Sequence, residues 1–298
     1  MISCIITGYK EPRTISQAIR QMIKASFKAG LKTDKEIIVL APDEETLAEA
    51  RSWESNRPEL NIRVIKDPGK GKPCALNIAF KEAKGDILIL SDGDVYVNQY
   101  AVRELLKRME DPSVGACSGH PKSIESKDNM FGYWSHLLTD IADKTRKESR
   151  GFVCSGYLYA LRAGIIKELP GDCLSDDAYI SYQVLNKGYG ISYAPGAQVF
   201  VKYPSNFKDW MAQKKRSTGG YTQLTAQYGL VHRKEMRSVG QEILGLWDVI
   251  KYANTPREFG WTLALIIARA WMWANIFWER KIIHKDFNKT WVRIGSTK

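Results

Sequence analysis

The sequence predicts an α/β fold, in which a mostly parallel sheet is covered by helices. Short apolar runs alternate with segments of helical periodicity along the first half of the chain, which is the pattern typical of parallel sheets. The chain has 298 residues, of which 44% are hydrophobic and 26% charged, so it is long enough to bury a sizeable core.

Each expected element follows from its own pattern. The strands are short apolar runs, expected at Ile2–Thr7, Glu36–Leu40, Asn61–Lys66 and Asp86–Ser91. The helices carry apolar residues at helical spacing and are expected at Thr14–Lys28, Glu44–Glu54, Pro73–Ala83 and Tyr100–Met109. In parallel sheets ligands bind beyond the carboxyl ends of the strands, so functional residues should follow these runs.

The second half of the chain is mixed and then helical. Phe152–Leu161 and Gly190–Lys202 are strand-like, and Asp176–Asn186 between them is helix-like. From Asn206 onward the chain reads as helical. We expect two regions, an α/β domain at 1–228, which is the extent of the family resemblance described below, and a helical C-terminal region at 229–298.

Charge and cysteine content limit the possible partners and the compartment. The formal net charge of +11 suggests an anionic partner, such as a phosphorylated substrate, an anionic membrane surface or a nucleic acid. The five cysteines include no Cys-x-x-Cys pair, which argues against a disulfide scaffold or a zinc site and favours a reducing, cytosolic compartment. Met1 leads directly into an apolar run without a basic leader, which favours a first strand over a signal peptide.

The segment "LSDGD" places two carboxylates at the end of the fourth expected strand. Carboxylate oxygens suit Mg²⁺ or Mn²⁺, and such ions commonly combine one or two protein carboxylates with substrate phosphates. Asp92 and Asp94 therefore indicate a metal-assisted site for a nucleoside diphosphate. The alternative is an acidic turn in which Gly93 adopts a positive φ.

A basic loop, "DPGKGKPCALN", runs from Asp67 to Asn77. Pro73 stands where a Walker loop needs Ser or Thr, and Cys74 where a dinucleotide fingerprint needs glycine, so both identifications fail. A flexible basic loop at a helix N-terminus remains, and such a loop favours an anion.

Two further motifs follow. Asp176 and Asp177 open a helix, where they either cap the helix or supply a general base. Gln213 and Arg216 lie three residues apart on an expected helix face, where Arg216 either reaches a diphosphate or forms an exposed basic helix end.

The order of these motifs resembles the inverting glycosyltransferases of family 2, and most of all the branch of cellulose, chitin and hyaluronan synthases. The resemblance covers roughly Met1 to Tyr228 and includes the phrases "IITGYKEP", "GKGKPCALNIAFKEAKGDILILSDGD" and "CSGYLYALRAG". It implies a GT-A fold, a nucleotide-sugar donor such as a UDP-sugar, and a divalent Mg²⁺ or Mn²⁺. The implied acceptor is a glycan or a lipid-linked sugar.

The resemblance also implies roles for individual residues. Asp92 corresponds to the residue that contacts the nucleotide sugar, Asp94 to the metal ligand and Asp177 to the catalytic base. Lys72 supplies further cationic help, and Gln213 and Arg216 match the family's Q-x-x-R-W motif. Two positions depart from the family. Ser217 replaces the tryptophan of that motif, and the nucleobase loop is shifted, leaving Asp43 as the expected base contact.

The C-terminal region predicts contact with a membrane surface. Gly260–Trp278 approaches the ~20 residues that span a bilayer, but Arg269 at its centre would cost about 2.5–3.5 kcal/mol there. With the amphipathic Val239–Tyr252, it favours helices that lie in the interface. The alternative is apolar helices packed on the domain. The expected location is the cytoplasmic face of the cell membrane, peripheral or monotopic.

Two other functions are compatible with the composition. A sugar-phosphate nucleotidyltransferase shares the α/β sheet but needs a glycine-rich basic signature after the first strand, which "TGYKEP" matches poorly. A basic protein that binds nucleic acid would show strongly salt-dependent affinity. The motif order favours the transferase, so no nucleic-acid partner is expected.

Overall fold

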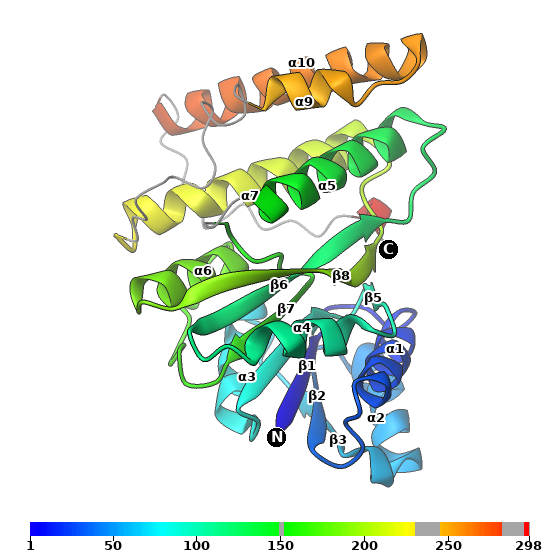
Figure 1. Cartoon of the computed structure of the whole chain (residues 1–298), viewed down its shortest axis with the longest axis vertical. Coiled ribbons are helices and arrows are strands. Elements are labelled where there is room, and N and C mark those ends of the chain that lie inside the picture. Colours follow the sequence, from blue (N-terminus) through cyan, green and yellow to red (C-terminus); the bar gives the residue numbers. More distant parts are fainter. Residues whose placement is uncertain (149–151, 230–244, 282–294, 298) are drawn as a thin grey trace. The chain divides into compact units, whose positions relative to one another are not determined.

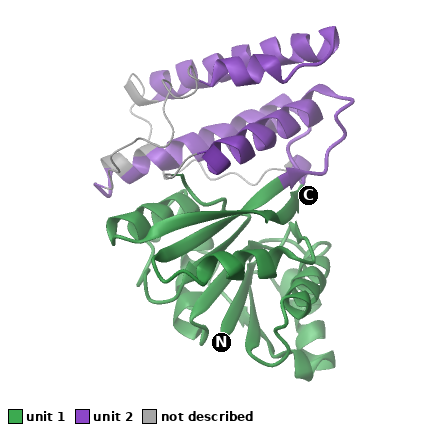
Figure 2. Ribbon diagram, in the orientation of Figure 1, with its two compact units in different colours: residues 1–121, 149–201 green, residues 122–148, 202–298 purple. Residues whose placement is uncertain are grey.

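The computed structural model describes residues 1–148, 152–229, 245–281 and 295–297. It divides into two compact units, shown in green and purple in Figure 2. The first unit comprises Met1–Pro121 and Ser149–Val201, and the second comprises Lys122–Glu148 and Lys202–Lys298. The expected division into 1–228 and 229–298 stays a prediction.

The first unit is built on a mixed sheet. Within the described residues, eight strands follow the order β3-β2-β1-β4-β7-β6-β8-β5. Their bounds are β1 Ile2–Thr7, β2 Lys35–Ala41, β3 Ile62–Lys66, β4 Ile87–Asp92, β5 Tyr96–Val97, β6 Val114–Ser123, β7 Leu158–Arg162 and β8 Gly190–Val201. The first four strands of this order are parallel, and β7 is antiparallel to β4 and β6.

The helices of the first unit alternate with its strands as the sequence predicts (Figure 1). Their bounds are α1 Ile15–Lys28, α2 Glu44–Asn56, α3 Lys72–Glu82, α4 Ala101–Met109 and α6 Asp176–Asn186, with a 3-10 turn, η1, at Pro58–Leu60. Pro73 lies in the first turn of α3, as expected. The α/β prediction is confirmed.

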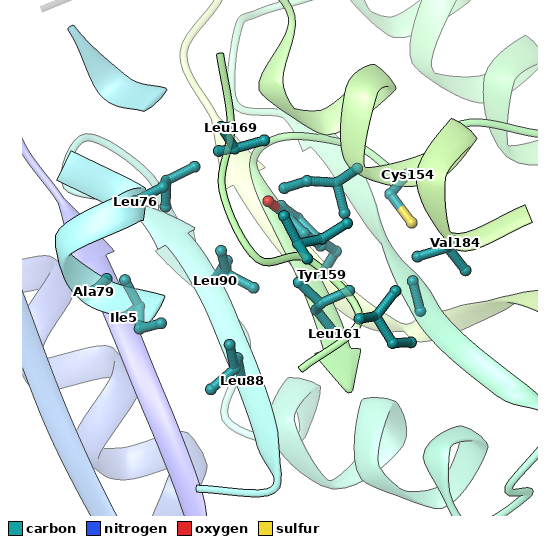
Figure 3. Close-up of a cluster of buried hydrophobic side chains, with 14 of the residues drawn as sticks. Ile5, Leu76, Ala79, Leu88, Leu90, Cys154, Tyr159, Leu161, Leu169 and Val184 are labelled. Atoms are coloured by element: carbon teal, nitrogen blue, oxygen red, sulfur yellow. The ribbon is translucent and has the colours of Figure 1, made fainter. Parts of the chain in front are cut away.

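The buried core joins the parallel and antiparallel halves of this sheet. Figure 3 shows Leu76 and Ala79 of α3 beside Ile5 of β1, with Leu88 and Leu90 of β4 facing Tyr159 and Leu161 of β7. The register pairs Leu90 with Tyr159. Because β4 is covered on both faces, its apolar run carries no polar alternation until the strand ends.

The sequence-based prediction is wrong in one part of this sheet. The strand expected at Phe152–Leu161 begins only at Leu158, and the preceding residues form a loop. Gly156 in that loop donates its N–H to a carboxylate of α6, an interaction outside the sheet that no apolar pattern encodes.

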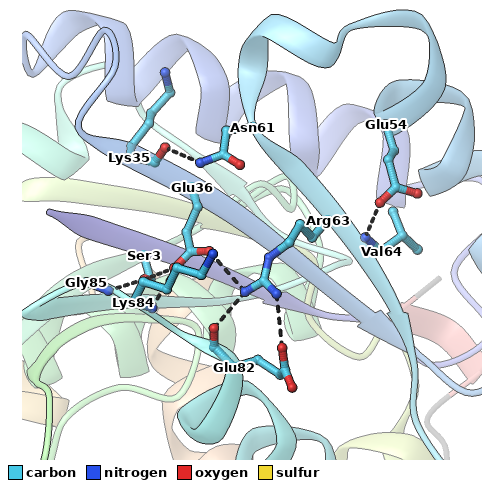
Figure 4. A network of polar contacts seen from close by, with 10 residues as sticks. All are labelled: Ser3, Lys35, Glu36, Glu54, Asn61, Arg63, Val64, Glu82, Lys84 and Gly85. Carbon is cyan, nitrogen blue, oxygen red and sulfur yellow. Dashed lines mark hydrogen bonds and ion pairs between the residues drawn. The ribbon is translucent and has the colours of Figure 1, made fainter.

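A polar network joins the first residues of β1 and β2 to neighbouring elements (Figure 4). Glu36, whose side chain is 1% exposed, accepts hydrogen bonds from Ser3 Oγ at 2.6 Å and Lys84 N at 2.7 Å. Arg63 Nη2 lies 3.0 Å from its other oxygen. Burial alone would raise the pKa of Glu36, but these donors outweigh it and lower that pKa.

The second unit is helical in its described part. It contains α5 Met130–Glu148, α7 Phe207–Ala226, α9 Leu246–Lys251 and α10 Pro256–Lys281, with a 3-10 turn, η3, at Gly295–Thr297. Trp134 of α5 donates its indole N–H to the carbonyl of Trp261 at 2.7 Å and packs 5.1 Å from the ring of Trp210. These aromatic contacts join α5, α7 and α10.

One side of α10 is therefore packed within its own unit. The expected segment Val239–Tyr252 is represented by α9, and its first part, 239–244, lies outside the described residues. Over the residues that the structure describes, no helix has both the length and the apolar character needed to cross a bilayer.

Candidate active site

The two aspartates of "DGD" lie at the carboxyl end of β4, where the sequence places them. Asp92 is the last residue of the strand and is in register with Thr7 of β1. The hydroxyl of Thr7 donates to Asp92 Oδ1 at 3.4 Å, and the backbone N–H of Gly93 donates to the carbonyl of Thr7 at 2.8 Å. The first strand thus fixes the turn that carries both carboxylates.

The glycine between the aspartates is closely packed. Gly93 is not among the glycines with positive φ, so the alternative of a left-handed turn at this position is wrong. A Cβ there would lie 2.9 Å from Ile15 Cδ1 and 3.3 Å from the Gly8 Cα and the Thr7 carbonyl oxygen. Since carbon atoms normally approach to about 3.5–4.0 Å, no larger residue fits without displacement.

Lys72 brings two acidic motifs together. Its ammonium lies 2.7 Å from Asp92 Oδ1 and 3.4 Å from Asp176 Oδ2. It also donates to the carbonyl of Gly156 at 3.4 Å. Lys72 begins α3, directly after Gly71, whose φ of +100° suits glycine. The basic loop therefore delivers a cation to the strand end, and anion binding by this loop stays a prediction.

Asp177 is held by three donors at the start of α6. Its Oδ1 accepts from Ser175 Oγ and from the N–H of Ala178, both at 2.8 Å, and its Oδ2 accepts from the N–H of Gly156 at 3.0 Å. An ionised carboxylate offers about four acceptor positions. Asp177 is therefore both a helix-start residue and a carboxylate with acceptor capacity left.

Asp176 is the less satisfied member of the acidic pair. Its Oδ2 is buried and has no well-aligned hydrogen bond among the described residues, although Lys72 is an ion-pair partner. Burial raises the pKa of Asp176, and the neighbouring Asp177 adds to this effect. Burial also raises the pKa of Asp92, with Asp94 contributing repulsion, while Lys72 opposes both shifts.

The structure adds Gly156 and Tyr159 to the residues that the sequence singled out. Tyr159 on β7 is fully buried, and its hydroxyl has no hydrogen-bond partner among the described residues. Burial raises the pKa of Tyr159 well above its usual value, and the charges of Asp176 and Asp177 raise it further. "CSGYLYALRAG" contains both residues, but only the antiparallel pairing of β7 with β4 brings them toward the aspartates.

The remaining expected residues belong to other elements of the chain. Asp43 caps α2, accepting from Thr46 N at 3.0 Å and Lys10 N at 2.7 Å, so it has a structural role whether or not it meets a nucleobase. Gln213 and Arg216 lie on α7 in the second unit. The Oε1 of Gln213 is buried and accepts no hydrogen bond within the described part of the chain. Donor binding by these three residues stays a prediction.

The strand-end carboxylates fit a divalent cation that is completed by a ligand. Among the described residues, no three His, Cys, Asp or Glu side chains form a cage for a metal ion. Mg²⁺ and similar hard cations need only one or two carboxylates when phosphates fill the remaining positions. The carboxylates of Asp92, Asp176 and Asp177 act on the ammonium of Lys72, and Asp94 acts on Asp92. The donor chemistry of these carboxylates suits such an ion.

Comparison with known proteins gives two family matches. Residues 3–169 match the model of "Glycosyl transferase family 2", and residues 87–278 match that of "Glycosyl transferase family group 2". A probable glycosyltransferase of Bacillus subtilis, YdaM, is 26% identical over 295 residues, which cover 93% of this chain and 67% of that protein. The poly-beta-1,6-N-acetyl-D-glucosamine synthase of Staphylococcus aureus is 22% identical over 237 residues, covering 76% of this chain. This chain spans 56% of the length of that synthase.

Solved structures share the fold. The mannosyltransferase PcManGT of Pyrobaculum calidifontis, solved with GDP-Man and Mn²⁺, has a TM-score of 0.62 at 19% identity and covers 97% of this chain and 82% of its own. TarS 1–349 of Staphylococcus aureus, solved with UDP-GlcNAc, has a TM-score of 0.52 at 16% identity, covering 93% of this chain and 79% of its own. With these likenesses, the expectation of a GT-A fold is confirmed.

Proposed function

The chain belongs to glycosyl transferase family 2, and we propose that this glycosyltransferase moves a sugar from a nucleotide sugar to an acceptor hydroxyl with inversion at the anomeric carbon. The observation that carries the proposal is the convergence of Asp92, Lys72 and the Asp176–Asp177 pair at the carboxyl end of β4. Donors named in the solved relatives, UDP-GlcNAc and GDP-Man, support a nucleotide sugar. Family membership also argues against the sugar-phosphate nucleotidyltransferase that the composition left open.

Asp177 acts as the general base in this proposal. The proton of the acceptor hydroxyl passes to its carboxylate as the acceptor oxygen forms a bond to the anomeric carbon. The bond from that carbon to the diphosphate oxygen breaks, and its electron pair leaves with the nucleoside diphosphate. Three donors already hold the carboxylate, so its orientation is fixed before the acceptor arrives, and an acceptor position remains for the proton.

The other side chains serve the departing diphosphate. Asp94, the metal ligand that the resemblance implies, would hold the divalent cation. In this proposal Asp92, to which the resemblance gives a contact with the nucleotide sugar, would share that cation, which when bound supplies Lewis-acid stabilisation of the leaving group. Lys72 places an ammonium between Asp92 and Asp176, where it can bind the anionic diphosphate.

A donor screen tests the proposed reaction. The full-length protein is incubated with UDP- and GDP-sugars and with glycan or lipid-linked acceptors, in the presence of Mg²⁺ or Mn²⁺, and nucleotide release is measured. We expect acceptor-dependent release with one nucleotide class and its loss when the metal is chelated. Release that is unaffected by chelation would refute the metal's part, and tight DNA binding without any release would favour the nucleic-acid alternative.

We further propose that α10 attaches the enzyme to a membrane surface, in keeping with the expected location at the cytoplasmic face. Four residues spaced four apart, Phe259, Leu263, Ile267 and Trp271, lie on one side of the helix and are 43–69% exposed. Phe277 and Trp278 extend this apolar surface, and Trp247 of α9 is 64% exposed.

Basic residues stand beside the aromatic ones on these helices. The Lys251 ammonium lies 4.9 Å from the Trp247 ring, and the Arg257 guanidinium lies 4.4 Å from the Trp261 ring. Tryptophan and basic side chains on an amphipathic helix are typical of helices that bind anionic lipid surfaces. A lipid surface therefore suits this face better than a purely apolar protein groove does.

Vesicle flotation tests the attachment. The full chain should float with vesicles containing anionic lipid and partly dissociate in high salt, because each basic residue near such a surface contributes about 1 kcal/mol. The double variant Ile267→Glu, Trp271→Glu should remain at the bottom of the gradient. Ile124→Glu changes another exposed apolar residue, 51% exposed, and should float like the wild type. A wild-type protein that never floats would refute the attachment.

A further inference from the structure

In the ligand-free structure the ammonium of Lys72 lies against the carboxylates that could also bind a metal cation. Its ammonium is 2.7 Å from Asp92 and 3.4 Å from Asp176, two carboxylates supplied by the end of β4 and the start of α6. The side chains are 28%, 24% and 15% exposed for Lys72, Asp92 and Asp176, so solvent screens them only partly. Burial disfavours the charge of Lys72, yet the carboxylates outweigh it and keep its pKa above the usual value.

Each proposed ligand, when it binds alone, meets a charge of its own sign in the site. A divalent cation approaching Asp92 meets the ammonium of Lys72 on the same carboxylate, and like charges at this distance repel strongly in a partly buried site. A diphosphate alone meets the carboxylates of Asp92, Asp176 and Asp177, which repel it and also hold the ammonium of Lys72. A cation and a diphosphate arriving together carry charges that cancel, and they leave the charge balance of the cluster unchanged.

We propose that Lys72 is the resident counter-ion of the ligand-free site, and that it exchanges partners when the donor binds: its ammonium moves from Asp92 and Asp176 to the diphosphate as the divalent cation takes its place on Asp92. This inference rests on the proposed function. Its consequence is that Lys72 lowers the affinity for metal alone and couples metal binding to nucleotide binding. The long unbranched side chain of lysine permits such a movement without displacing α3.

The coupling is reciprocal by thermodynamic necessity, so it can be measured from either ligand. Calorimetric titrations of the full-length protein with Mn²⁺, with and without UDP or GDP, should show that nucleotide raises the affinity of the wild type for Mn²⁺ by about tenfold or more. In Lys72→Met, Mn²⁺ alone should bind about fivefold or more tightly than in the wild type, whereas UDP or GDP alone should bind more weakly.

Matched variants separate this role from simple diphosphate binding. Lys72→Arg keeps the positive charge and should keep the weak Mn²⁺ affinity of the wild type. Lys81→Met removes an exposed lysine from the last turn of α3 and should change neither titration. Lys72→Gln supplies a second neutral variant, with an amide that can still donate to Asp92, in case Lys72→Met does not fold.

Two negative outcomes have different meanings. If neither nucleotide changes Mn²⁺ affinity in the wild type, the proposed nucleotide-sugar function is itself refuted. Suppose that nucleotide raises the Mn²⁺ affinity of the wild type, but that Mn²⁺ alone binds the two neutral variants no more tightly than it binds the wild type. Lys72 then binds the diphosphate without competing with the metal. The exchange is then wrong and the proposed function stands.

Discussion

Asp177→Asn separates the chemical role of this carboxylate from its structural one. The substitution replaces one oxygen by an amide NH₂ and removes the proton acceptor, so turnover should fall by about 10²–10⁴-fold. The change is not neutral for the structure, because both oxygens accept hydrogen bonds. If the amide oxygen of the variant accepts the hydrogen bonds from Ser175 and Ala178, the amide NH₂ faces the backbone N–H of Gly156. In the wild type that N–H donates to Asp177 Oδ2 at 3.0 Å. Leaving that donor unpaired should lower the free energy of unfolding by about 1–3 kcal/mol.

Asp176→Asn is the matched control for this prediction. The buried Oδ2 of Asp176 has no well-aligned hydrogen bond among the described residues, so Asp176→Asn weakens the ion pair with Lys72 but leaves no backbone N–H unpaired as Asp177→Asn does. Nucleotide release at saturating donor, UDP or GDP affinity by calorimetry and urea unfolding should be measured for both variants. The reasoning is refuted if Asp177→Asn retains turnover within about tenfold of the wild type, a barrier change of only about 1.4 kcal/mol. If Asp176→Asn alone abolishes turnover with nucleotide affinity intact, the base is Asp176.

Three further predictions concern the carboxyl end of β4 and the first residues of β2. Asp94→Ala should abolish the Mn²⁺-dependent part of UDP or GDP affinity in calorimetry while urea unfolding stays near wild type; an unchanged metal dependence would remove Asp94 from the site. Gly93→Ala should lower the free energy of unfolding by about 1–3 kcal/mol through overpacking against Ile15, whereas Gly171→Ala, with open space around it, should stay within about 0.5 kcal/mol; equal stabilities would contradict the packing explanation. Glu36→Gln should be less stable by about 1.5–3 kcal/mol at pH 7, since it loses charged hydrogen bonds. Because the folded pKa of Glu36 is lowered, its contribution is present above the ordinary value of 4.5 and is lost as the pH falls through the folded value, so the difference should narrow in acid; a constant difference would contradict this.

The parallel half of the sheet could be predicted from the sequence because its strands and helices are encoded by patterns of neighbouring residues. Each strand from β1 to β4 is a short apolar run, and each helix between them has its own periodicity and start signal, such as Pro73 in α3. The antiparallel half was less predictable. β7 is one short strand inside a longer apolar stretch, and its partners are β4 and β6, which are distant in sequence.

The candidate site shows the same limit. The positions of Asp92 and Asp177 followed from their motifs, whereas the partnership of Lys72 with both acidic motifs depends on three elements meeting in space. Gly93 illustrates the difference most clearly. The left-handed alternative considered for this glycine is wrong, and the turn that it occupies instead packs closely against Ile15 and Gly8, which lie far away along the chain.

The pairing of β4 with β7 has a consequence for how the chain emerges from the ribosome. β4 ends at Asp92, and the strand that covers its second edge begins at Leu158. At synthesis rates of roughly 5–20 residues per second, that edge stays unpaired for about 3–13 s. An apolar strand with a free edge is a template for association with other chains. Fragments that stop before Leu158 should therefore aggregate rather than yield a nucleotide-binding half, and nascent chains of this length are where chaperones would be needed most.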